Sequence, residues 1–297
     1  LQAMLVRHRT VAMQYSPNNL IPYIGLVDAG TVELVRSFGK EIVSSGDLVA
    51  RFEAAWSEEQ IASHFAARDA IVPECFREIG RRARNGGATE YQIQQWLAEA
   101  FRRAGLVTED LPIVAVNANS GNPHYGPQAQ GSSAIKTGDF VLLDIWAKKN
   151  TPNAVYYDIT WTGVIGTPSE KQVEIFNIVT GARDAGIKKV QEAFAGKRRI
   201  AGWEVDQATR EHITNAGYAQ YFTHRTGHSI GVNVHGNGAN MDNLETKDDR
   251  EIIPNTCFSI EPGIYLPEFG VRSEVNVLTR NGAAEVTGKI QNELVLI

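Results

Sequence analysis

The sequence has few cysteines, no long apolar run and no excess of basic residues. Only two of its 297 residues are cysteines, Cys75 and Cys257, and they lie far apart. We therefore expect reduced thiols in a cytoplasmic protein rather than a disulfide framework. No apolar stretch approaches the ~20 residues that a membrane-spanning helix needs. The net charge of -5 favours neither nucleic acid nor an anionic membrane as a partner.

The first residues give no sign of a signal peptide, because no charged start followed by an apolar stretch is visible. The chain opens at Leu1 rather than Met, and we expect a fragment from which an upstream domain or targeting segment is missing. Residues 1–50 are predicted to be the remnant of an N-terminal α/β domain plus a linker. They contain a helical pattern at 28–39, a short strand and a turn at 44–47. Residues 51–297 are predicted to form the main domain.

Two stretches of the main domain repeat each other at a nearly constant offset. The helix-capping pattern at Ser57–Gln60 returns at Ser169–Gln172, which is 112 residues later. An apolar strand that ends in Asp144 returns as a strand that ends in Glu261, which is 117 residues later. Several such matches in the same order predict two similar halves, each made of two helices followed by a β-hairpin.

Four carboxylates fall at equivalent places in the two hairpins. Asp144 and Glu261 follow apolar strand residues, while Asp158 and Glu274 lie in the strands that come next. A single acid is most often a solvated surface residue, but a buried carboxylate is costly unless it is paired or bound to a metal. If the hairpins meet at a pseudo-two-fold axis, two divalent cations ~3.5–4 Å apart would neutralise the four acids.

Four of the seven histidines gather in two segments. His124 lies in a loop rich in glycine and proline, and His224, His228 and His235 fall within twelve residues. A lone histidine is usually a satisfied surface or core residue. Three together, beside glycines and paired acids, predict one metal ligand plus general acid or base groups.

The motifs TGHSIG, SIEPGIY and GVRSE, with LLDIW and YYDIT, resemble the metal-binding signature of the pita-bread metallopeptidases. This family includes methionine aminopeptidase, Xaa-Pro aminopeptidase, prolidase and the metal-free creatinase. The resemblance covers about residues 50–297. It implies an α+β pita-bread fold with two pseudo-symmetric halves of helices and β-hairpins around a curved antiparallel sheet. Residues 1–50 resemble the end of the N-terminal domain found in the creatinase/prolidase branch.

The resemblance also implies a metallopeptidase with two divalent metal ions. The implied metal ligands are Asp144, Asp158, His228, Glu261 and Glu274. Asp158 and Glu274 would bridge the ions, and a metal-bridging hydroxide would be the nucleophile. Oxygen and nitrogen ligands suit Mn, Co, Fe or Zn, among which we favour Mn.

The implied catalytic residues are Glu261, His124, His224 and His235. Glu261 would shuttle protons, and the histidines would bind substrate and stabilise or protonate the tetrahedral intermediate. Two further residues are expected to support the ligands. Arg272 is expected to orient Glu274, because residues two apart share a strand face. Thr160 stands likewise beside Asp158.

The leading hypothesis is an exopeptidase that hydrolyses peptides with proline in the second position, as Xaa-Pro aminopeptidase and prolidase do. The complete ligand set disfavours the creatinase branch, and His224 together with residues 1–50 favours the prolyl-peptide branch over methionine aminopeptidase. The expected partner is a peptide substrate, and homodimerisation is common where the N-terminal domain is complete. Two alternatives remain open: a metallohydrolase acting on a non-peptide C–N or ester bond, and a non-catalytic peptide-binding module on the same fold.

The sequence departs from the family pattern in the first hairpin and after His235. Asp144 and Asp158 are fourteen residues apart, whereas the family spacing is eleven. Trp146 stands where a small residue is common; it either lines the pocket or belongs to a hydrophobic layer. The residues after His235 read Gly-Asn-Gly, where relatives place an acid and then a proline. Valine also follows Glu274, where relatives usually have Asp. These changes put the substrate preference in doubt more than metal binding.

Overall fold

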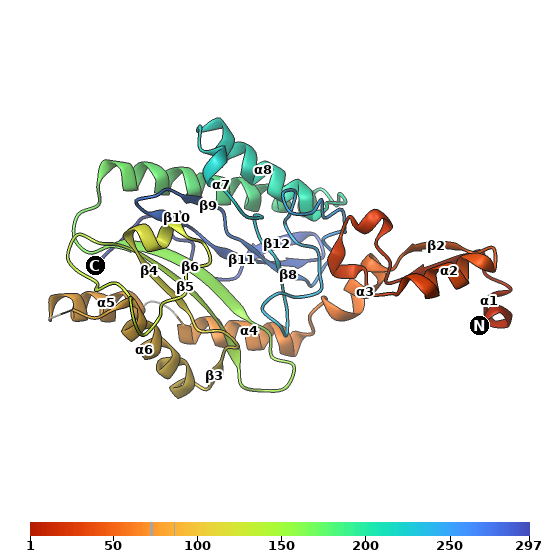
Figure 1. The fold of residues 1–297 in the computed structure, drawn as a ribbon, viewed down its shortest axis with the longest axis horizontal. Coiled ribbons are helices and arrows are strands. Elements are labelled where there is room, and N and C mark those ends of the chain that lie inside the picture. The colour runs from red at the N-terminus through yellow and green to blue at the C-terminus, as the bar shows by residue number, and fades with distance from the viewer. Residues whose placement is uncertain (72–73, 86) are drawn as a thin grey trace.

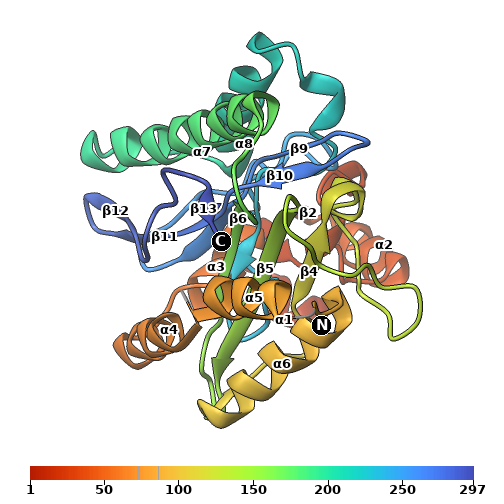
Figure 2. The ribbon, with the colours of Figure 1, turned by 90° about the vertical axis from the view of Figure 1, so that its left-hand side faces the viewer.

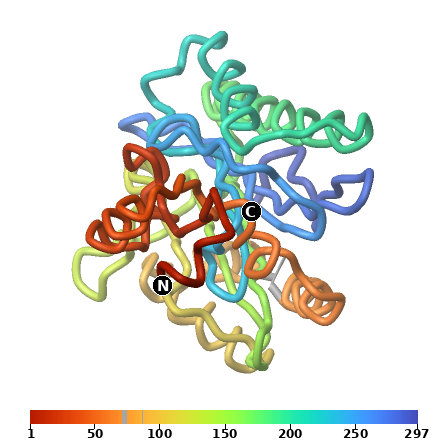
Figure 3. Tube along the Cα trace, turned by 90° about the vertical axis from the view of Figure 1, so that its right-hand side faces the viewer, coloured from red at the N-terminus to blue at the C-terminus, as the bar shows by residue number. Residues whose placement is uncertain are grey.

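The structure, a computed structural model, describes residues 1–71, 74–85 and 87–297. The N-terminal segment projects to the right in Figure 1 and faces the viewer in Figure 3. Its strands β1 and β2 pair in parallel, and helix α2 connects them in the sequence. Its elements are α1 (Gln2–Leu5), β1 (Thr10–Met13), η1 (Pro17–Asn19), η2 (Pro22–Ile24), α2 (Ala29–Ser37), β2 (Glu41–Ser44) and α3 (Gly46–Glu53).

The structure differs from the turn predicted at 44–47, because helix α3 already begins at Gly46 and continues to Glu53. The helix is stabilised by packing rather than by a side-chain cap. Ala50 is buried and packs with Ala54 against Ile253 of the main domain. A short helix gains most of its stability from such tertiary contacts, which the local sequence does not reveal.

The first half of the main domain begins with helices that cover one side of a sheet (Figure 2). Strand β5 pairs antiparallel with β6, β4 and β3. Capping boxes start two of the helices, at Ser57 and Thr89. The elements are α4 (Glu58–Ile71), α5 (Glu74–Arg84), α6 (Glu90–Arg103), β3 (Leu106–Val107), β4 (Ile113–Val116), η3 (Asn117–Gly121), β5 (Phe140–Lys149) and β6 (Tyr157–Val164).

The second half carries two long helices on the opposite side of the molecule (Figures 1 and 2). Strands β12, β11, β8 and β7 pair in that order, and β9 pairs with β10. The C-terminal strand β13 adds to β6 in parallel. The elements are α7 (Glu170–Ala195), α8 (Gly202–Asn215), η4 (Ala219–Tyr221), β7 (Ser229–Ile230), β8 (Cys257–Ile260), β9 (Gly263–Tyr265), β10 (Gly270–Arg272), β11 (Val275–Arg280), β12 (Ala283–Val286) and β13 (Val295–Leu296).

The structure corrects one detail of the predicted halves. The strand expected to end in Asp144 continues to Lys149, because it pairs with β6 as far as Ala147 and with β3 at Lys149. In the first half the described residues form α4 and α5, on either side of residues 72 and 73, and then α6, and the second half has the two helices that were expected. The capping box at Ser169, which begins α7, is present as predicted.

The two halves join where β6 meets β10 and β11. The side-chain amide of Asn276 accepts from the backbone N–H of Asp158 at 3.0 Å and donates to its carbonyl at 2.6 Å. The backbone N–H of Glu274 donates to the carbonyl of Thr160 at 3.1 Å. These contacts hold the acid-bearing strands of both halves against each other. None of the described helices is long and apolar enough to cross a membrane.

Candidate metal centre

The five predicted metal ligands come together where the two halves meet. Asp144 lies on β5 and Asp158 on β6, with both side chains buried. His228 directly precedes β7, Glu261 directly follows β8, and Glu274 lies between β10 and β11. A cavity of about 480 Å³ opens beside them. Its lining includes the predicted site residues Asp144, Asp158, His228, Glu261, His124, His224, His235 and Arg272.

Three of these residues present atoms close enough to share one metal ion. One ligand atom each from Asp158, His228 and Glu274 lies within 4.8 Å of the others, and all three side chains are buried. The ring nitrogen Nδ1 of His228 lies 3.1 Å from the carbonyl of Ser229. A carbonyl only accepts, so this Nδ1 carries a proton.

The other ring nitrogen of His228, Nε2, shows whether this site requires a cation. Its Nε2 atom lies 3.4 Å from Asp158 Oδ2 and 3.3 Å from Glu261 Oε1. In a neutral imidazole with Nδ1 protonated, the Nε2 lone pair would point at two carboxylate oxygens. Either a second proton or a cation must lie between them, and a divalent metal meets this requirement for all three groups at once.

The carboxylates carry more negative charge than the polypeptide neutralises. Burial, reinforced by neighbouring acids, raises the pKa of Asp144 to about 7 and also raises the pKa of Glu274. Burial raises the pKa of Asp158 as well. One oxygen of Glu274, Oε1, is buried and has no hydrogen-bond partner among the described residues. An unpartnered carboxylate oxygen that faces other acids fits a cation ligand.

Glu261 differs from the other acids because it is surrounded by donors and positive charge. Burial acts to raise its pKa, but His228 and Arg272 outweigh burial, so its pKa falls below the ordinary value. The hydroxyl of Ser259 donates to Oε1 at 2.9 Å, and Arg272 Nε lies 3.9 Å from Oε2. Glu261 is therefore held ionised in a fixed orientation.

Thr160 and Arg272 support the ligands differently from the sequence-based expectation. Thr160 Oγ1 lies 2.8 Å from Asp144 Oδ1 and 3.0 Å from Glu274 Oε2, so it contacts these two acids rather than Asp158. Arg272 pairs directly with Asp144, and its Nε donates to Thr160 Oγ1 at 3.0 Å. The cause is strand register, because Thr160 stands opposite Asp144 on β5. The Thr160 hydroxyl thus links Arg272 to Glu274.

Comparison with known proteins places the chain in a family. The model of metallopeptidase family M24 matches residues 64–281. The chain belongs to metallopeptidase family M24. The Xaa-Pro dipeptidase of Lactobacillus helveticus is 35% identical over 209 residues, which is 69% of this chain and 52% of that protein. The Xaa-Pro dipeptidase of Pyrococcus furiosus is 35% identical over 184 residues, which is 61% of this chain and 48% of that protein.

The chain thus spans about half the length of these M24 relatives. The crystal structure of an X-Pro aminopeptidase from Thermotoga maritima MSB8 superposes with a TM-score of 0.73 at 24% identity, covering 100% of this chain and 78% of that one. This likeness shows the fold. The predicted α+β pita-bread architecture and the resemblance to the Xaa-Pro aminopeptidase/prolidase branch of M24 are confirmed.

The predicted histidines of this M24 chain occupy three different settings. His224 donates from Nδ1 to the carbonyl of Arg225 at 2.7 Å, and its Nε2 accepts from the Tyr265 hydroxyl at 2.7 Å. Burial lowers the pKa of His224 to about 4, so the ring is neutral near pH 7. The ring of His235 packs edge-on against His228, with centroids 4.3 Å apart. His124 is exposed at the cavity lining.

Sequence reasoning missed two residues that complete the network. Tyr265 is buried, and its hydroxyl accepts from Arg272 Nη1 at 3.3 Å. Ser259 accepts the backbone N–H of His228 at 2.9 Å and donates to Glu261. Both residues lie inside the motif SIEPGIY, so the sequence contained a motif that could have pointed to them. The partners His228 of Ser259 and His224 of Tyr265 lie 31 and 41 residues away in the chain, however, and only the fold brings these pairs together.

The lengthened first hairpin reaches the segment that carries the histidines. Lys148 Nζ donates to the carbonyl of Val232 at 2.6 Å and lies 5.0 Å from the centre of the Tyr156 ring. The backbone N–H of Tyr156 donates to Gly231 at 3.0 Å. Trp146 is half-buried, and both of the roles that the sequence left open for it, lining the pocket and packing in a hydrophobic layer, are present. It lines the cavity and also packs, as Val234 does, against a hydrophobic cluster that includes Tyr156 and Ile230.

Proposed function

We propose that this protein is a dinuclear metal-dependent exopeptidase that hydrolyses peptides with proline in the second position. The observation that carries the proposal is the His228 Nε2 atom facing Asp158 and Glu261 at 3.4 and 3.3 Å. This arrangement calls for a cation beside a cavity lined with histidines. Relatives over most of the chain bear the name Xaa-Pro dipeptidase, which supports the choice of substrate.

The donor set of four carboxylates and one imidazole supports the proposal of divalent ions at this site. Asp158, His228 and Glu274 would hold one ion between them, and Asp144 and Glu261 would supply the remaining carboxylate ligands. Such ions, when bound, act as Lewis acids and lower the pKa of water. The ligand set of oxygen and nitrogen atoms suits Mn, Co, Fe or Zn, with Mn favoured.

The chain's own residues would handle the protons. Glu261 is ionised and faces the cavity, so it can take a proton from the attacking water and pass it to the leaving amine. His124 and His235 also line the cavity and can contact the peptide carbonyl. His224 already uses both ring nitrogens. In this arrangement it positions Tyr265, and it can donate to substrate only if that hydrogen bond breaks.

A panel of substrates tests the proposal. Purified protein loaded with manganese should hydrolyse Ala-Pro or Ala-Pro-Gly and leave Ala-Ala intact, and a His235→Asn variant should retain metal but lose most of the rate. Turnover of an ester or a non-peptide amide without turnover of either prolyl peptide would replace the peptidase by the alternative hydrolase. Peptide binding with no turnover of any of these substrates would favour the binding module. The cytoplasmic location and the homodimer stay predictions.

A further inference from the structure

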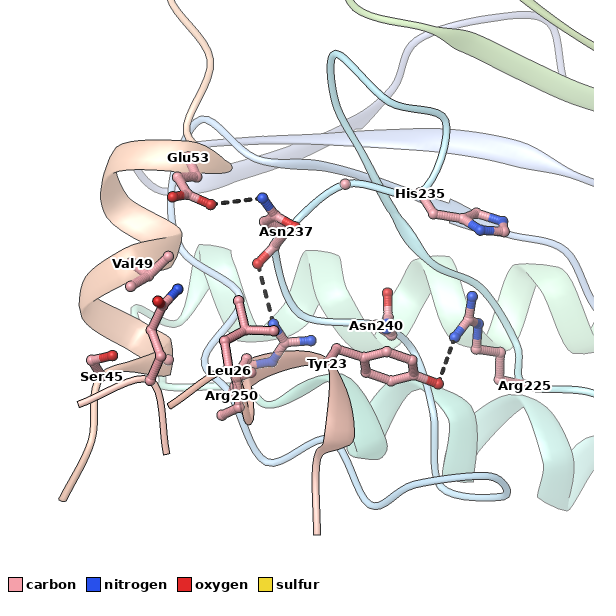
Figure 4. Close-up of a pocket in the computed structure, with 14 residues that line it drawn as sticks. Tyr23, Leu26, Ser45, Val49, Glu53, Arg225, His235, Asn237, Asn240 and Arg250 are labelled. Carbon is pink, nitrogen blue, oxygen red and sulfur yellow. Dashed lines mark hydrogen bonds between the residues drawn. The ribbon is translucent and has the colours of Figure 1, made fainter. Parts of the chain in front are cut away.

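A second cavity adjoins the catalytic cavity and is shown in Figure 4. It measures about 230 Å³ and lies between the N-terminal segment and the main domain. Leu26, Val49 and Glu53 line one side, and Asn237 and Asn240 line the other. Two residues line both this cavity and the catalytic one, namely Arg225 and His235. A molecule that extends from the metal centre therefore passes Arg225.

The guanidinium of Arg225 has no acidic partner in the described part of the chain. Its only side-chain hydrogen bond there runs from Nη1 to the Tyr23 hydroxyl at 3.2 Å, with Cζ lying 5.8 Å from the centre of the Tyr23 ring (Figure 4). The other arginines of the two cavities are paired, Arg272 with Asp144 and Arg250 with Asp248. Arg225 is thus the cavity arginine whose charge remains uncompensated within residues 1–71, 74–85 and 87–297.

The acidic residues that line the two cavities near Arg225 do not form an ion pair with it. Glu53, at the far side of the second cavity, is exposed and accepts from the Asn237 amide at 2.6 Å. Asp110 and Glu245 line the catalytic cavity, and both are exposed. None of the three lies within ion-pair distance of Arg225 in the described structure.

We propose that Arg225, held by Tyr23, binds the free carboxylate of a short peptide substrate at the junction of the two cavities. A planar guanidinium with open N–H groups matches a carboxylate in charge and in geometry. The same charge repels an α-ammonium group. The substrate therefore lies with its amino end toward the metal centre and its carboxyl end toward Arg225.

Through Tyr23, the N-terminal segment contributes to substrate specificity. It lies in η2, and its hydroxyl accepts from Arg225. Tyr23 acts as a positioning residue, because it fixes a long side chain that would otherwise lose rotamer freedom on binding. This inference rests on the proposed function for the identity of the substrate, but carboxylate recognition can be measured without turnover.

The test compares an acid with its amide, using the full chain loaded with manganese. N-acetyl-L-proline and N-acetyl-L-prolinamide are titrated by calorimetry, and the hydrolysis of Ala-Pro and Ala-Pro amide is followed in parallel. Wild-type protein should bind the acid about tenfold or more tightly than the amide, as expected for a charge-assisted hydrogen bond. Arg225→Met should abolish this preference while leaving the amide unaffected, Arg225→Lys should restore part of it, and Tyr23→Phe should weaken it by raising KM for the acid.

The chain offers a matched control. Arg36 Nη2 donates to the Tyr15 hydroxyl at 3.0 Å, with Cζ 5.4 Å from the centre of that ring, and neither residue lines either cavity. Arg36→Met and Tyr15→Phe should change neither titration. An equal loss for acid and amide in Arg225→Met, or a preference that survives the substitution, overturns the proposal. If neither dipeptide is hydrolysed, the proposed function fails and the titrations alone decide carboxylate recognition.

Discussion

His228 turns its Nε2 atom toward Asp158 Oδ2 at 3.4 Å while its Nδ1 atom faces the Ser229 carbonyl at 3.1 Å. The carbonyl fixes the proton on Nδ1, so the nitrogen that faces the acids is the one available to a metal. Burial acts to lower the pKa of His228, but Asp158 and Glu261 outweigh it and the pKa rises. Without a cation, the ring must take up a proton to satisfy its neighbours.

The metal-free protein should accordingly be less stable than the metal-loaded protein. Four carboxylates, of which Asp144, Asp158 and Glu274 are buried, face one another when no cation is present. A ligand that binds only the folded state at a hundred times its Kd stabilises that state by about 2.7 kcal/mol. Thermal unfolding should show a higher Tm with manganese than with a chelator. Asp158→Asn should show little or no rise on adding manganese, and an equal rise in the variant would contradict this assignment.

Thr160 is expected to tune metal binding through the two acids that it contacts. Thr160→Val removes the hydrogen bonds to Asp144 and Glu274, and metal affinity should fall by about 10–100-fold. The control is Thr162→Val on the same face of the same strand, because the Thr162 hydroxyl is buried and has no partner among the described residues. Competition with a chromophoric chelator measures both affinities, and equal values for the two variants would rule out this role.

The long first hairpin is expected to hold the backbone between His228 and His235 in position. Lys148→Met removes the contact with the Val232 carbonyl. Because small displacements of catalytic groups are costly, kcat/KM for a prolyl peptide should drop on the order of tenfold. Lys149→Met is the neighbouring control, since Lys149 Nζ reaches the Ala104 carbonyl at 3.2 Å instead. Similar losses in both variants would show a general effect on the hairpin.

Stability should fall in mild acid because of His64, which lies outside the metal centre. This buried ring donates from Nδ1 to the Tyr156 carbonyl at 2.6 Å and accepts at Nε2 from Thr287 at 2.7 Å. Burial lowers the pKa of His64 from 6.5 to about 4. The unfolded chain therefore binds the extra proton first, and stability is lost as the pH falls from 6.5 toward 4.

The size of this effect follows from the pKa difference. The free energy of unfolding should drop by about 2 kcal/mol between pH 7 and pH 5 from this group alone. Urea unfolding at both pH values measures it, and His64→Gln should lack this part of the dependence. His8→Gln, at an exposed histidine, should keep it. The same loss in wild type and His64→Gln would contradict the assignment.

Much of the fold and of the site could be predicted because the two halves repeat each other. The capping patterns at Ser57 and Ser169 and the acids at matching offsets pointed to two helix-and-hairpin units, and the M24 match confirms the family. The paired hairpins predict that Asp158 and Glu274 lie together, the family resemblance implies His228 beside them, and the structure brings the three side chains close to one another. Both signals depend on local sequence and regular spacing.

What could not be predicted depends on contacts between distant segments. Strand register placed Thr160 opposite Asp144, so its hydroxyl met Asp144 and Glu274 rather than Asp158. The packing of Ala50 and Ala54 against Ile253 stabilises helix α3, which the local sequence did not predict. The approach of Tyr23 to Arg225 joins residues 202 positions apart. No spacing rule for one strand or helix contains such information.

The most direct test of the central claim is metal content measured together with activity on one sample. Metal analysis of purified, manganese-loaded protein should find two divalent ions per chain. Hydrolysis of Ala-Pro or Ala-Pro-Gly should stop on chelation, return with manganese and be absent in Asp158→Ala. Hydrolysis at an unchanged rate by protein stripped of metal would contradict the account.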